Sequence, residues 1–191
     1  METKKELRKA LRLQRSALST EAAEALSLRA QNHILAQSAW NNARCVGLYC
    51  PMRMETDTAR LKNAARSVGK LTFFPRTEPA GIMEMLPCAD DSLMHKSSFG
   101  ILEPRPEICP QPPGSGWNLD IIIVPGIVYD RRGYRIGSAG GYYDRFFARP
   151  SMQSVIRIGL CYGFQLVDHI VPDAWDIPMH AIATEEGILW L

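Results

Sequence analysis

The chain has 191 residues, of which 46% are apolar and 22% are charged, and its formal net charge at pH 7 is +2. This composition is typical of a globular domain with a substantial core, so we expect a single domain over residues 1–191. A net charge so close to zero argues against a nucleic-acid partner, and with no run of 18 apolar residues the sequence predicts no membrane-spanning helix.

The cysteines and histidines do not form a recognisable metal or disulfide pattern. The five cysteines are odd in number and contain no C-x-x-C pair, and the four histidines form no H-x-x-x-H pair. This pattern fits neither a zinc site nor a disulfide framework, and it favours a reducing compartment. The N-terminus has a charged helical pattern without the apolar core of a signal peptide. We therefore expect a cytoplasmic protein, and a monomer.

The first forty residues predict a helical hairpin. Leucines and alanines recur at helical spacing over residues 3–18, and basic residues fill most of the other positions, which gives a helix with a cationic face. Ser19 or Thr20 can cap a second helix, in which Leu26, Ala30 and Ile34 recur every four residues. The simpler interpretation is that the cationic face is exposed to solvent. The alternative is that one lysine and one arginine of this face contact a polyphosphate.

A βαβ unit is expected next. The apolar run at 45–50 ends at Pro51, a helix capped by Asp57 ends at Gly69, and a second strand covers 71–75. This order implies a parallel sheet, and ligands of such sheets gather at the carboxyl ends of the strands. We therefore predict that Glu55 and Arg53, Arg76 and the loop after Val124 share one rim of the sheet.

The remaining elements are shorter. Residues 82–86 predict an edge strand, residues 121–124 a buried strand, residues 155–162 a further strand, and residues 182–191 a last short strand or cap. Residues 103–117 are rich in proline and glycine, and we interpret them as an ordered surface loop.

The passage from Gly126 to Arg149 is the most distinctive part of the chain. It is basic and glycine-rich, and it follows the buried run that ends at Val124. Glycines at 137, 140 and 141 leave backbone N–H groups uncovered, so this loop can wrap around an anion such as phosphate. The helix expected from Tyr142 would add its positive end. A plain tight turn is an equally good interpretation, because the loop matches neither a Walker A loop nor G-x-G-x-x-G.

Other candidate residues also leave two interpretations open. Asp144 caps a helix or pairs with Arg145, or else it binds a metal. Glu55 is a loop carboxylate or accepts hydrogen bonds from N–H groups of a heterocycle. Tyrosines 49, 142 and 143 belong to the core or rim, or stack on a flat ring. The sequence contains no evident Ser-His-Asp or Cys-His arrangement, so we expect no covalent enzyme intermediate.

Residues 135–145, RIGSAGGYYDR, resemble the signature of the 5-formyltetrahydrofolate cyclo-ligase family, R-L-G-x-G-x-G-Y-Y-D-R. The resemblance extends along nearly the whole chain in the family's order. Its other parts are Lys4-x3-Arg8, residues 48–52 with Glu55-x-Asp57-Thr58, residues 99–104, residues 123–126 with Asp130 and Gly133, and Pro172-x2-Trp175-Asp176-Ile177-Pro178 with Thr184-Glu185.

The resemblance implies a three-layer α/β/α fold with a mostly parallel central sheet, as in sugar-phosphate isomerases and coenzyme A transferases. It also implies an enzyme that uses ATP and Mg²⁺ to close 5-formyltetrahydrofolate to 5,10-methenyltetrahydrofolate, with release of ADP and phosphate. The partner is then a small-molecule substrate. A non-catalytic or regulatory nucleotide- or folate-binding member of the same fold is the alternative.

By position, the resemblance assigns roles to individual residues. Arg135 and Asp144 are the expected catalytic residues, Asp144 and Asp176 the magnesium ligands, and Cys50, Glu55 and Tyr142 the substrate contacts. The expected ATP contacts are Lys4, Arg8, Arg135, Gly137, Ser138, Ala139, Gly140, Gly141, Tyr142 and Tyr143. Ala139 stands where the family usually has glycine, and Gly140 where some members have lysine.

Overall fold

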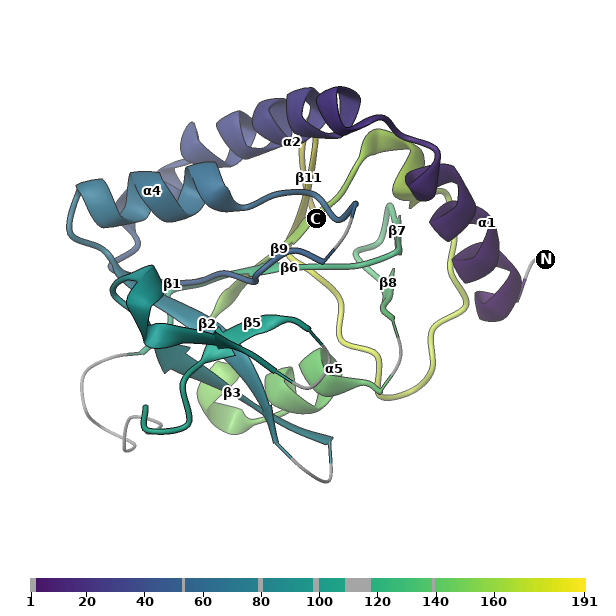
Figure 1. The fold of residues 1–191 in the computed structure, drawn as a ribbon. Coiled ribbons are helices and arrows are strands. Elements are labelled where there is room, and N and C mark those ends of the chain that lie inside the picture. Colours follow the sequence, from purple (N-terminus) through teal and green to yellow (C-terminus); the bar gives the residue numbers. More distant parts are fainter. Residues whose placement is uncertain (1–2, 53, 79–80, 98–99, 109–117, 139) are drawn as a thin grey trace.

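The computed structural model describes residues 3–52, 54–78, 81–97, 100–108, 118–138 and 140–191 (Figure 1). Its α-helices are α1 (Lys4–Ser16), α2 (Thr20–Leu35), α3 (Ser38–Asn42), α4 (Ala59–Ser67) and α5 (Tyr142–Phe147). Its strands are β1 (Cys45–Gly47), β2 (Leu71–Glu78), β3 (Ile82–Pro87), β4 (Met94–Lys96), β5 (Leu102–Pro104), β6 (Ile121–Val124), β7 (Val128–Asp130), β8 (Arg135–Ile136), β9 (Ile156–Leu160), β10 (Leu166–Val167), β11 (Ala181–Thr184) and β12 (Gly187–Trp190). None of the helices in the described ranges is long and apolar enough to cross a membrane.

A mostly parallel sheet forms the centre of the fold. Its strand order is β12-β11-β9-β6-β1-β2-β3, and the five strands from β11 to β2 run parallel. The outer strands β12 and β3 pair antiparallel with their neighbours. The predicted βαβ unit is confirmed by the parallel pairing of β1 with β2 across α4, and the edge position predicted for residues 82–86 is confirmed by β3.

Helices cover both faces of this sheet, as Figure 1 shows: α2 and α4 lie on one face and α5 on the other. The apolar core has two parts, one on each face of the sheet. Strand β6 contributes side chains to both parts, because successive side chains of a strand point to opposite faces. Ile121 and Ile123 pack with α2 and α4, whereas Ile122 and Val124 pack with Phe146 and Phe147 of α5. All four residues of β6 are fully buried. The α/β fold class and the mostly parallel sheet are thereby confirmed.

A second, three-stranded sheet of order β10-β7-β8 lies beside the large one. Tyr129 of β7 connects the two, because its ring lies against Gly126 and Gly159 and its hydroxyl donates to the Val124 carbonyl at 2.7 Å. A small cluster of apolar side chains joins this sheet to Leu7 and Leu11 of α1. The small sheet therefore fixes the position of α1 at one end of the molecule (Figure 1).

Sequence signals at the helix ends are mostly confirmed. Ser19 caps α2 by accepting from the Ala22 N–H at 3.1 Å, and Gly69 follows α4 with φ +74°. Thr3 and Glu6 form a capping box at the start of α1. The expectation that Asp57 caps α4 is wrong, since Thr58 is the N-cap residue. Residues 182–191 form parts of two strands rather than one, and most of the loop expected at 103–117 lies outside the described residues.

Candidate active site

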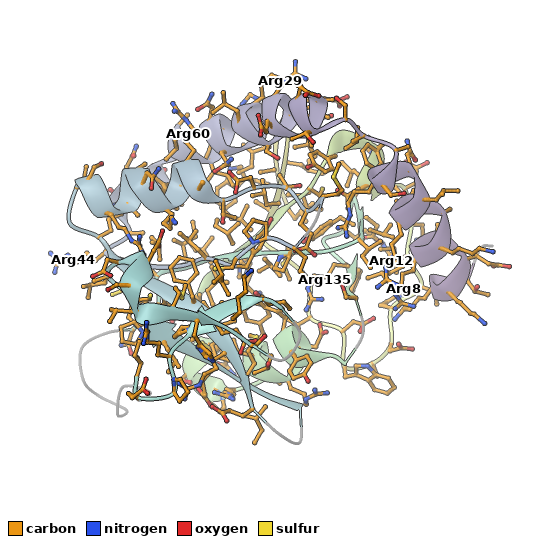
Figure 2. The ribbon with its side chains drawn as sticks, in the orientation of Figure 1. Arg8, Arg12, Arg29, Arg44, Arg60 and Arg135 are labelled. Atoms are coloured by element: carbon orange, nitrogen blue, oxygen red, sulfur yellow. The ribbon has the colours of Figure 1, made fainter. Side chains whose placement is uncertain are left out.

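The first helix lies against the glycine-rich loop and holds two of its carbonyl groups. Arg8 Nε donates to the Gly137 carbonyl at 3.0 Å, and Arg12 Nη2 donates to the Ser138 carbonyl at 3.1 Å. Figure 2 shows Arg8, Arg12 and Arg135 on the same side of the molecule, away from Arg29, Arg44 and Arg60. The cationic face of the predicted helix is therefore directed at the loop, at least through Arg8 and Arg12.

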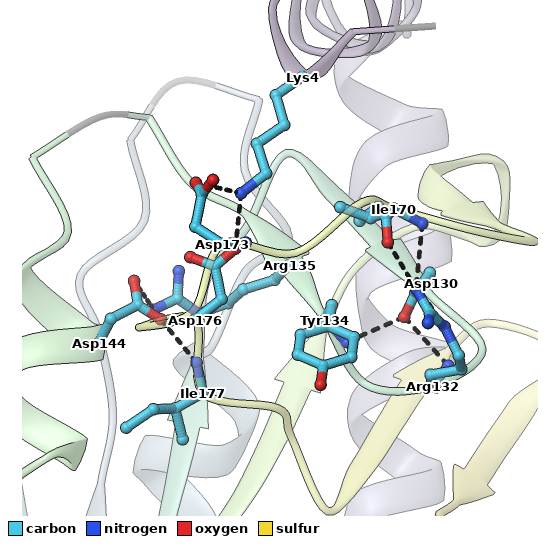
Figure 3. A network of polar contacts seen from close by, with 10 residues as sticks. All are labelled: Lys4, Asp130, Arg132, Tyr134, Arg135, Asp144, Ile170, Asp173, Asp176 and Ile177. Carbon is cyan, nitrogen blue, oxygen red and sulfur yellow. Dashed lines mark hydrogen bonds and ion pairs between the residues drawn. The ribbon is translucent and has the colours of Figure 1, made fainter. Parts of the chain in front are cut away.

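Lys4, one turn before Arg8, reaches the segment that precedes β11 (Figure 3). Its Nζ is 2.7 Å from Asp173 Oδ2 and 2.6 Å from Asp176 Oδ2. Partial burial by itself lowers the pKa of Lys4, but the hydrogen bonds to the two carboxylates outweigh it and raise the pKa above its usual value. Lys4 is therefore a firmly charged ammonium group between two aspartates.

Arg135 and Asp144 form a second ion pair below this one. Arg135 Nη2 is 3.2 Å from Asp144 Oδ2, and Asp144 Oδ1 accepts from the Ile177 N–H at 3.3 Å. The side chains of Arg135 and Asp144 are only 5% and 13% exposed. Within the described residues, the buried Nε of Arg135 has no hydrogen-bond partner. Because Ile177 follows Asp176, this contact places the Asp144 side chain next to the chain segment that carries the second candidate metal ligand.

A buried carboxylate holds the chain segments that carry these groups. Asp130 is fully buried and accepts hydrogen bonds from the backbone N–H groups of Arg132, Tyr134 and Ile170 at 2.9–3.0 Å, and from the guanidinium of Arg132 at 2.9 Å (Figure 3). It thereby fixes the turn before Arg135 and the chain a few residues before Asp173. A buried carboxylate that accepts several backbone hydrogen bonds holds in place chain segments that form few hydrogen bonds of regular secondary structure.

The glycine-rich loop enters α5 through two left-handed residues. Gly140 has φ +92° and Gly141 has φ +60°, and a Cβ on Gly140 would lie 2.8 Å from the Tyr142 ring. Arg145 lies over the Tyr142 ring at 5.4 Å and donates to the carbonyl groups of Gly81 and Gly140. The expected helix start at Tyr142 is confirmed. Ala139 lies outside the described residues.

Two of the candidate substrate contacts, Cys50 and Glu55, lie in the segment that follows β1. Glu55 Oε2 accepts from the Met52 N–H at 2.9 Å, and its Oε1 is 3.8 Å from Arg15 Nη1. The side chain of Glu55 is 8% exposed, so its charge is partly withdrawn from water. Burial raises the pKa of the Cys50 thiol to about 11, so this thiol stays protonated near neutral pH and is a poor nucleophile.

Tyr143 of α5 lies beside Arg135. The Arg135 guanidinium lies 5.4 Å from the centre of the Tyr143 ring. Burial raises the pKa of Tyr143, and the charge of Arg135 opposes this effect only in part. The tyrosine is therefore a neutral aromatic group next to a buried cation, a surface suited to a flat polar ring.

Sequence reasoning missed several members of this cluster. Arg12 continues the spacing of Lys4 and Arg8 by four residues, which places it on the same helix face, and Asp173 precedes Asp176 by three residues. Arg15 belongs to the same helix and reaches Glu55. The expectation that Arg76 joins this rim is wrong: it lies within β2 and bonds to Glu78 and to the carbonyl groups of Arg105 and Ile108. Arg53 lies outside the described residues.

The arrangement has the properties of a phosphate- and cation-handling site. Cationic side chains of α1 contact the glycine-rich loop and the segment with Asp173 and Asp176. Arg135 of β8 pairs with Asp144, whose other oxygen accepts from the backbone next to Asp176. In the described part of the chain, no three His, Cys, Asp or Glu side chains converge as a metal cluster. Mg²⁺ needs fewer, because it commonly uses one or two carboxylates together with phosphate oxygens and water.

Comparisons with known proteins agree on one family. Residues 1–185 match the model of the 5-formyltetrahydrofolate cyclo-ligase family. A 5-formyltetrahydrofolate cyclo-ligase of Haemophilus influenzae is 30% identical over 73% of this chain and 75% of its own length, and one of Escherichia coli (strain K12) is 27% identical over 93% and 98%. The solution structure of 5,10-methenyltetrahydrofolate synthetase from Aquifex aeolicus superimposes with a TM-score of 0.80 at 30% identity, covering 98% of this chain and 92% of that one.

Proposed function

The chain belongs to the 5-formyltetrahydrofolate cyclo-ligase family, and we propose that it closes 5-formyltetrahydrofolate to 5,10-methenyltetrahydrofolate at the expense of ATP, which leaves as ADP and phosphate. The observation that carries this proposal is the meeting of α1, the loop before α5 and the segment before β11. These three segments lie far apart in the sequence, and they bring Lys4 and Arg8, Arg135 and Asp144, and Asp176 to one place.

In this proposal the triphosphate of ATP lies between α1 and the glycine-rich loop. Lys4, Arg8 and Arg135 neutralise its charge, and the backbone of Gly137, Ser138, Gly140 and Gly141 supplies N–H donors together with Ala139. The buried Nε of Arg135, which has no partner within the described residues, supports a role for this residue toward an anion. Tyr142 and Tyr143 border the same space from the first turn of α5.

The acidic residues fit a bound magnesium ion. Asp176 and Asp173 already hold a cation, the Lys4 ammonium, at 2.6 and 2.7 Å, so the segment is built to bring carboxylate oxygens around positive charge. Asp144 and Asp176 would hold Mg²⁺, which would neutralise phosphate charge during phosphoryl transfer. Lys4 would then lose its ion pair with Asp176 and pair with phosphate oxygens instead.

The chemistry assigned to the substrate end follows from the poor reactivity of a formamide. The formyl oxygen takes the γ-phosphoryl group of ATP, N10 then attacks the formyl carbon, phosphate leaves, and N10 loses its proton. Arg135 stabilises the charge on the transferred group, and Glu55 and Cys50 contact the pterin side of the substrate. The reactive phosphorylated intermediate requires exclusion of water, to which Tyr142 and Tyr143 contribute.

A direct assay tests the proposal. The purified protein is mixed with 5-formyltetrahydrofolate, ATP and magnesium, and the near-UV absorbance of the conjugated methenyl product is followed. We expect absorbance to rise only when all three are present, with one ADP formed per product. Correctly folded protein that gives no absorbance change would overturn the proposal, and binding of nucleotide and folate without turnover would favour a regulatory member of the family.

A further inference from the structure

A pocket of about 480 Å³ opens beside Cys50, one of the candidate substrate contacts. Its walls come from the segment after β1 with Cys50 and Met52, the start of α4 with Lys62, and the β4–β5 hairpin with Lys96 and Leu102, and Phe74 of β2 also lines it. Much of the lining is apolar, but both lysine side chains belong to it. None of the roles assigned above uses these two lysines.

The charge around this pocket is positive. Lys62 Nζ is 2.7 Å from Asp91 Oδ2, and Arg66 Nη1 is 2.9 Å from Asp91 Oδ1, so two cations share one carboxylate. The Asp91 side chain is 64% exposed, and solvent therefore weakens its hold on both. The Lys96 ammonium forms no ion pair with any described residue. Asp57 is the acidic side chain among the described lining residues. An anion entering the pocket would thus meet excess positive charge.

Cys50 belongs both to this pocket and to the candidate substrate contacts, and it lines the pocket together with Lys62. Met52 also lines the pocket, and its backbone N–H donates to Glu55 Oε2 at 2.9 Å. Burial is the main cause of the raised pKa of Cys50, and the positive charge of Lys62 opposes this effect. The pocket therefore adjoins the candidate substrate contacts Cys50 and Glu55.

We propose that this pocket binds the acidic tail of the folate, with Lys62 and Lys96 as the cations that pair with its carboxylates. The inference rests on the proposed function and adds the position of the substrate. A folate has a reactive pterin end and a dicarboxylate glutamyl end joined by a benzoyl ring. With the formyl group near Arg135, the ring packs along Met52, Ile101 and Leu102, and the glutamyl carboxylates reach the two ammonium groups.

Equilibrium binding without ATP tests this placement. Calorimetry compares 5-formyltetrahydrofolate with 5-formyltetrahydropteroate, which is the same molecule without the glutamyl unit. Wild-type protein should bind the folate more tightly. Lys96→Gln should raise the Kd for the folate by about tenfold and raise the Kd for the pteroate much less, because the pteroate keeps a benzoate carboxylate but lacks the two glutamyl carboxylates that reach the lysines. Lys62→Gln should act in the same direction.

The control is Arg29→Gln, which removes one positive charge from the exposed outer side of α2, where Figure 2 shows Arg29 pointing away from the sheet. It should bind both ligands as the wild type does. Because the exposed Lys96 side chain forms no ion pair with any residue that the structure describes, its substitution should keep the melting temperature. Equal effects of Lys96→Gln on both ligands, or none, would overturn the inference.

The same experiment separates this inference from the proposed function. If wild-type protein forms methenyl product but the lysine variants bind the folate normally, only the tail site is wrong. If the tail preference depends on the lysines but no product forms with ATP, only the proposed reaction is wrong. Failure of wild-type protein to bind either ligand would overturn both.

Discussion

Asp144 makes contacts in two directions that are hard to replace. One oxygen faces Arg135 and the other accepts from the Ile177 backbone, in a region where both charged side chains are almost fully buried. Removing one charge of a buried pair leaves the other charge without compensation, which costs more than the pair contributes as a whole. An amide of the same shape keeps the hydrogen-bond acceptor and removes the charge, so Asp144→Asn isolates the charge.

We predict that Asp144→Asn lowers turnover of 5-formyltetrahydrofolate at least about tenfold, because both Arg135 and the proposed magnesium ion lose a negative partner. The free energy of unfolding should fall by about 1–3 kcal/mol, with the far-UV circular dichroism retained. Methenyl absorbance at limiting and saturating magnesium measures the first effect, and urea denaturation the second.

Asp168→Asn is the matched control, since the Asp168 side chain is 99% exposed and pairs only loosely with Arg131 at 3.5 Å. It should leave turnover and stability unchanged. Unchanged turnover of Asp144→Asn at limiting magnesium would rule out the metal role.

Individual site residues were predictable mainly where the chain carries a motif. Arg135, Gly141 and Asp144 stand in one short passage, and the comparison of motifs added Lys4 and Asp176. The pairing of Lys4 with Asp173, which are 169 positions apart, was not predictable, because nothing in the local pattern of either segment specifies the other. The same holds for Arg15 and Glu55.

At the scale of elements, the contact between β7 and β9 decides how the two sheets fit together. A Cβ on Gly159 of β9 would lie 2.3 Å from Tyr129 Cε1, and one on Gly126 would lie 2.6 Å from Tyr129 Cε2. Tyr129 is fully buried, so its ring has nowhere to move. The glycines therefore serve to admit an aromatic ring from the small sheet, rather than to form turns.

We predict that Gly159→Ala lowers the free energy of unfolding by about 1–3 kcal/mol through overpacking against the Tyr129 ring. Urea denaturation of the single variants and of Gly159→Ala with Tyr129→Leu provides a double-mutant cycle. Gly159→Ala should lower the free energy of unfolding clearly less in the Tyr129→Leu background, where the ring is absent. If the two substitutions change the free energy of unfolding by strictly additive amounts, the Tyr129 ring is not the cause of the destabilisation by Gly159→Ala.

The elements themselves were predictable in proportion to their length. The helices α1 and α2 and the β1–α4–β2 unit carry enough residues to display a period, and they are found as expected. The strands β7, β8 and β10 have only two or three residues each, too few for an alternating pattern, so the sequence predicts a loop where the first two lie. The position of these strands depends in part on contacts with residues distant in sequence, of Tyr129 with Gly159 and of Asp130 with Ile170.

At the scale of the whole molecule, His180 ties global stability to pH. Its Nδ1 accepts from the Arg157 backbone N–H at 3.1 Å, and its Nε2 lies 2.9 Å from Arg157 Nη2. Burial, followed by the charge of Arg157, lowers the pKa of His180 below its usual value of 6.5. Between the two pKa values the unfolded chain binds more protons than the folded one, so the stability present above pH 6.5 is lost as the pH falls toward the folded-state pKa.

We therefore predict that the wild-type protein loses more stability than His180→Gln between about pH 7.5 and about pH 5.5. Urea midpoints measured across this range for both proteins give the difference in their pH dependence of stability. The contribution of the carboxylates cancels from this difference, because both proteins contain the same carboxylates. His169→Gln, which alters an exposed histidine, should follow the wild type. Parallel curves for the wild type and His180→Gln would show that this histidine does not contribute to the pH dependence.

The strand order of the large sheet also has a consequence for how the chain assembles during synthesis. The strands β1, β2 and β3 with α4 are complete once Pro87 has been made, but the other neighbour of β1 is β6, which begins only at Ile121. Besides the outer edge of β3, which stays an edge in the finished sheet, a nascent chain in this interval has a second open edge along β1 next to an apolar surface, which favours association with other chains. Because β1 offers only three residues at that edge, the exposed template is short until β6 emerges and closes it.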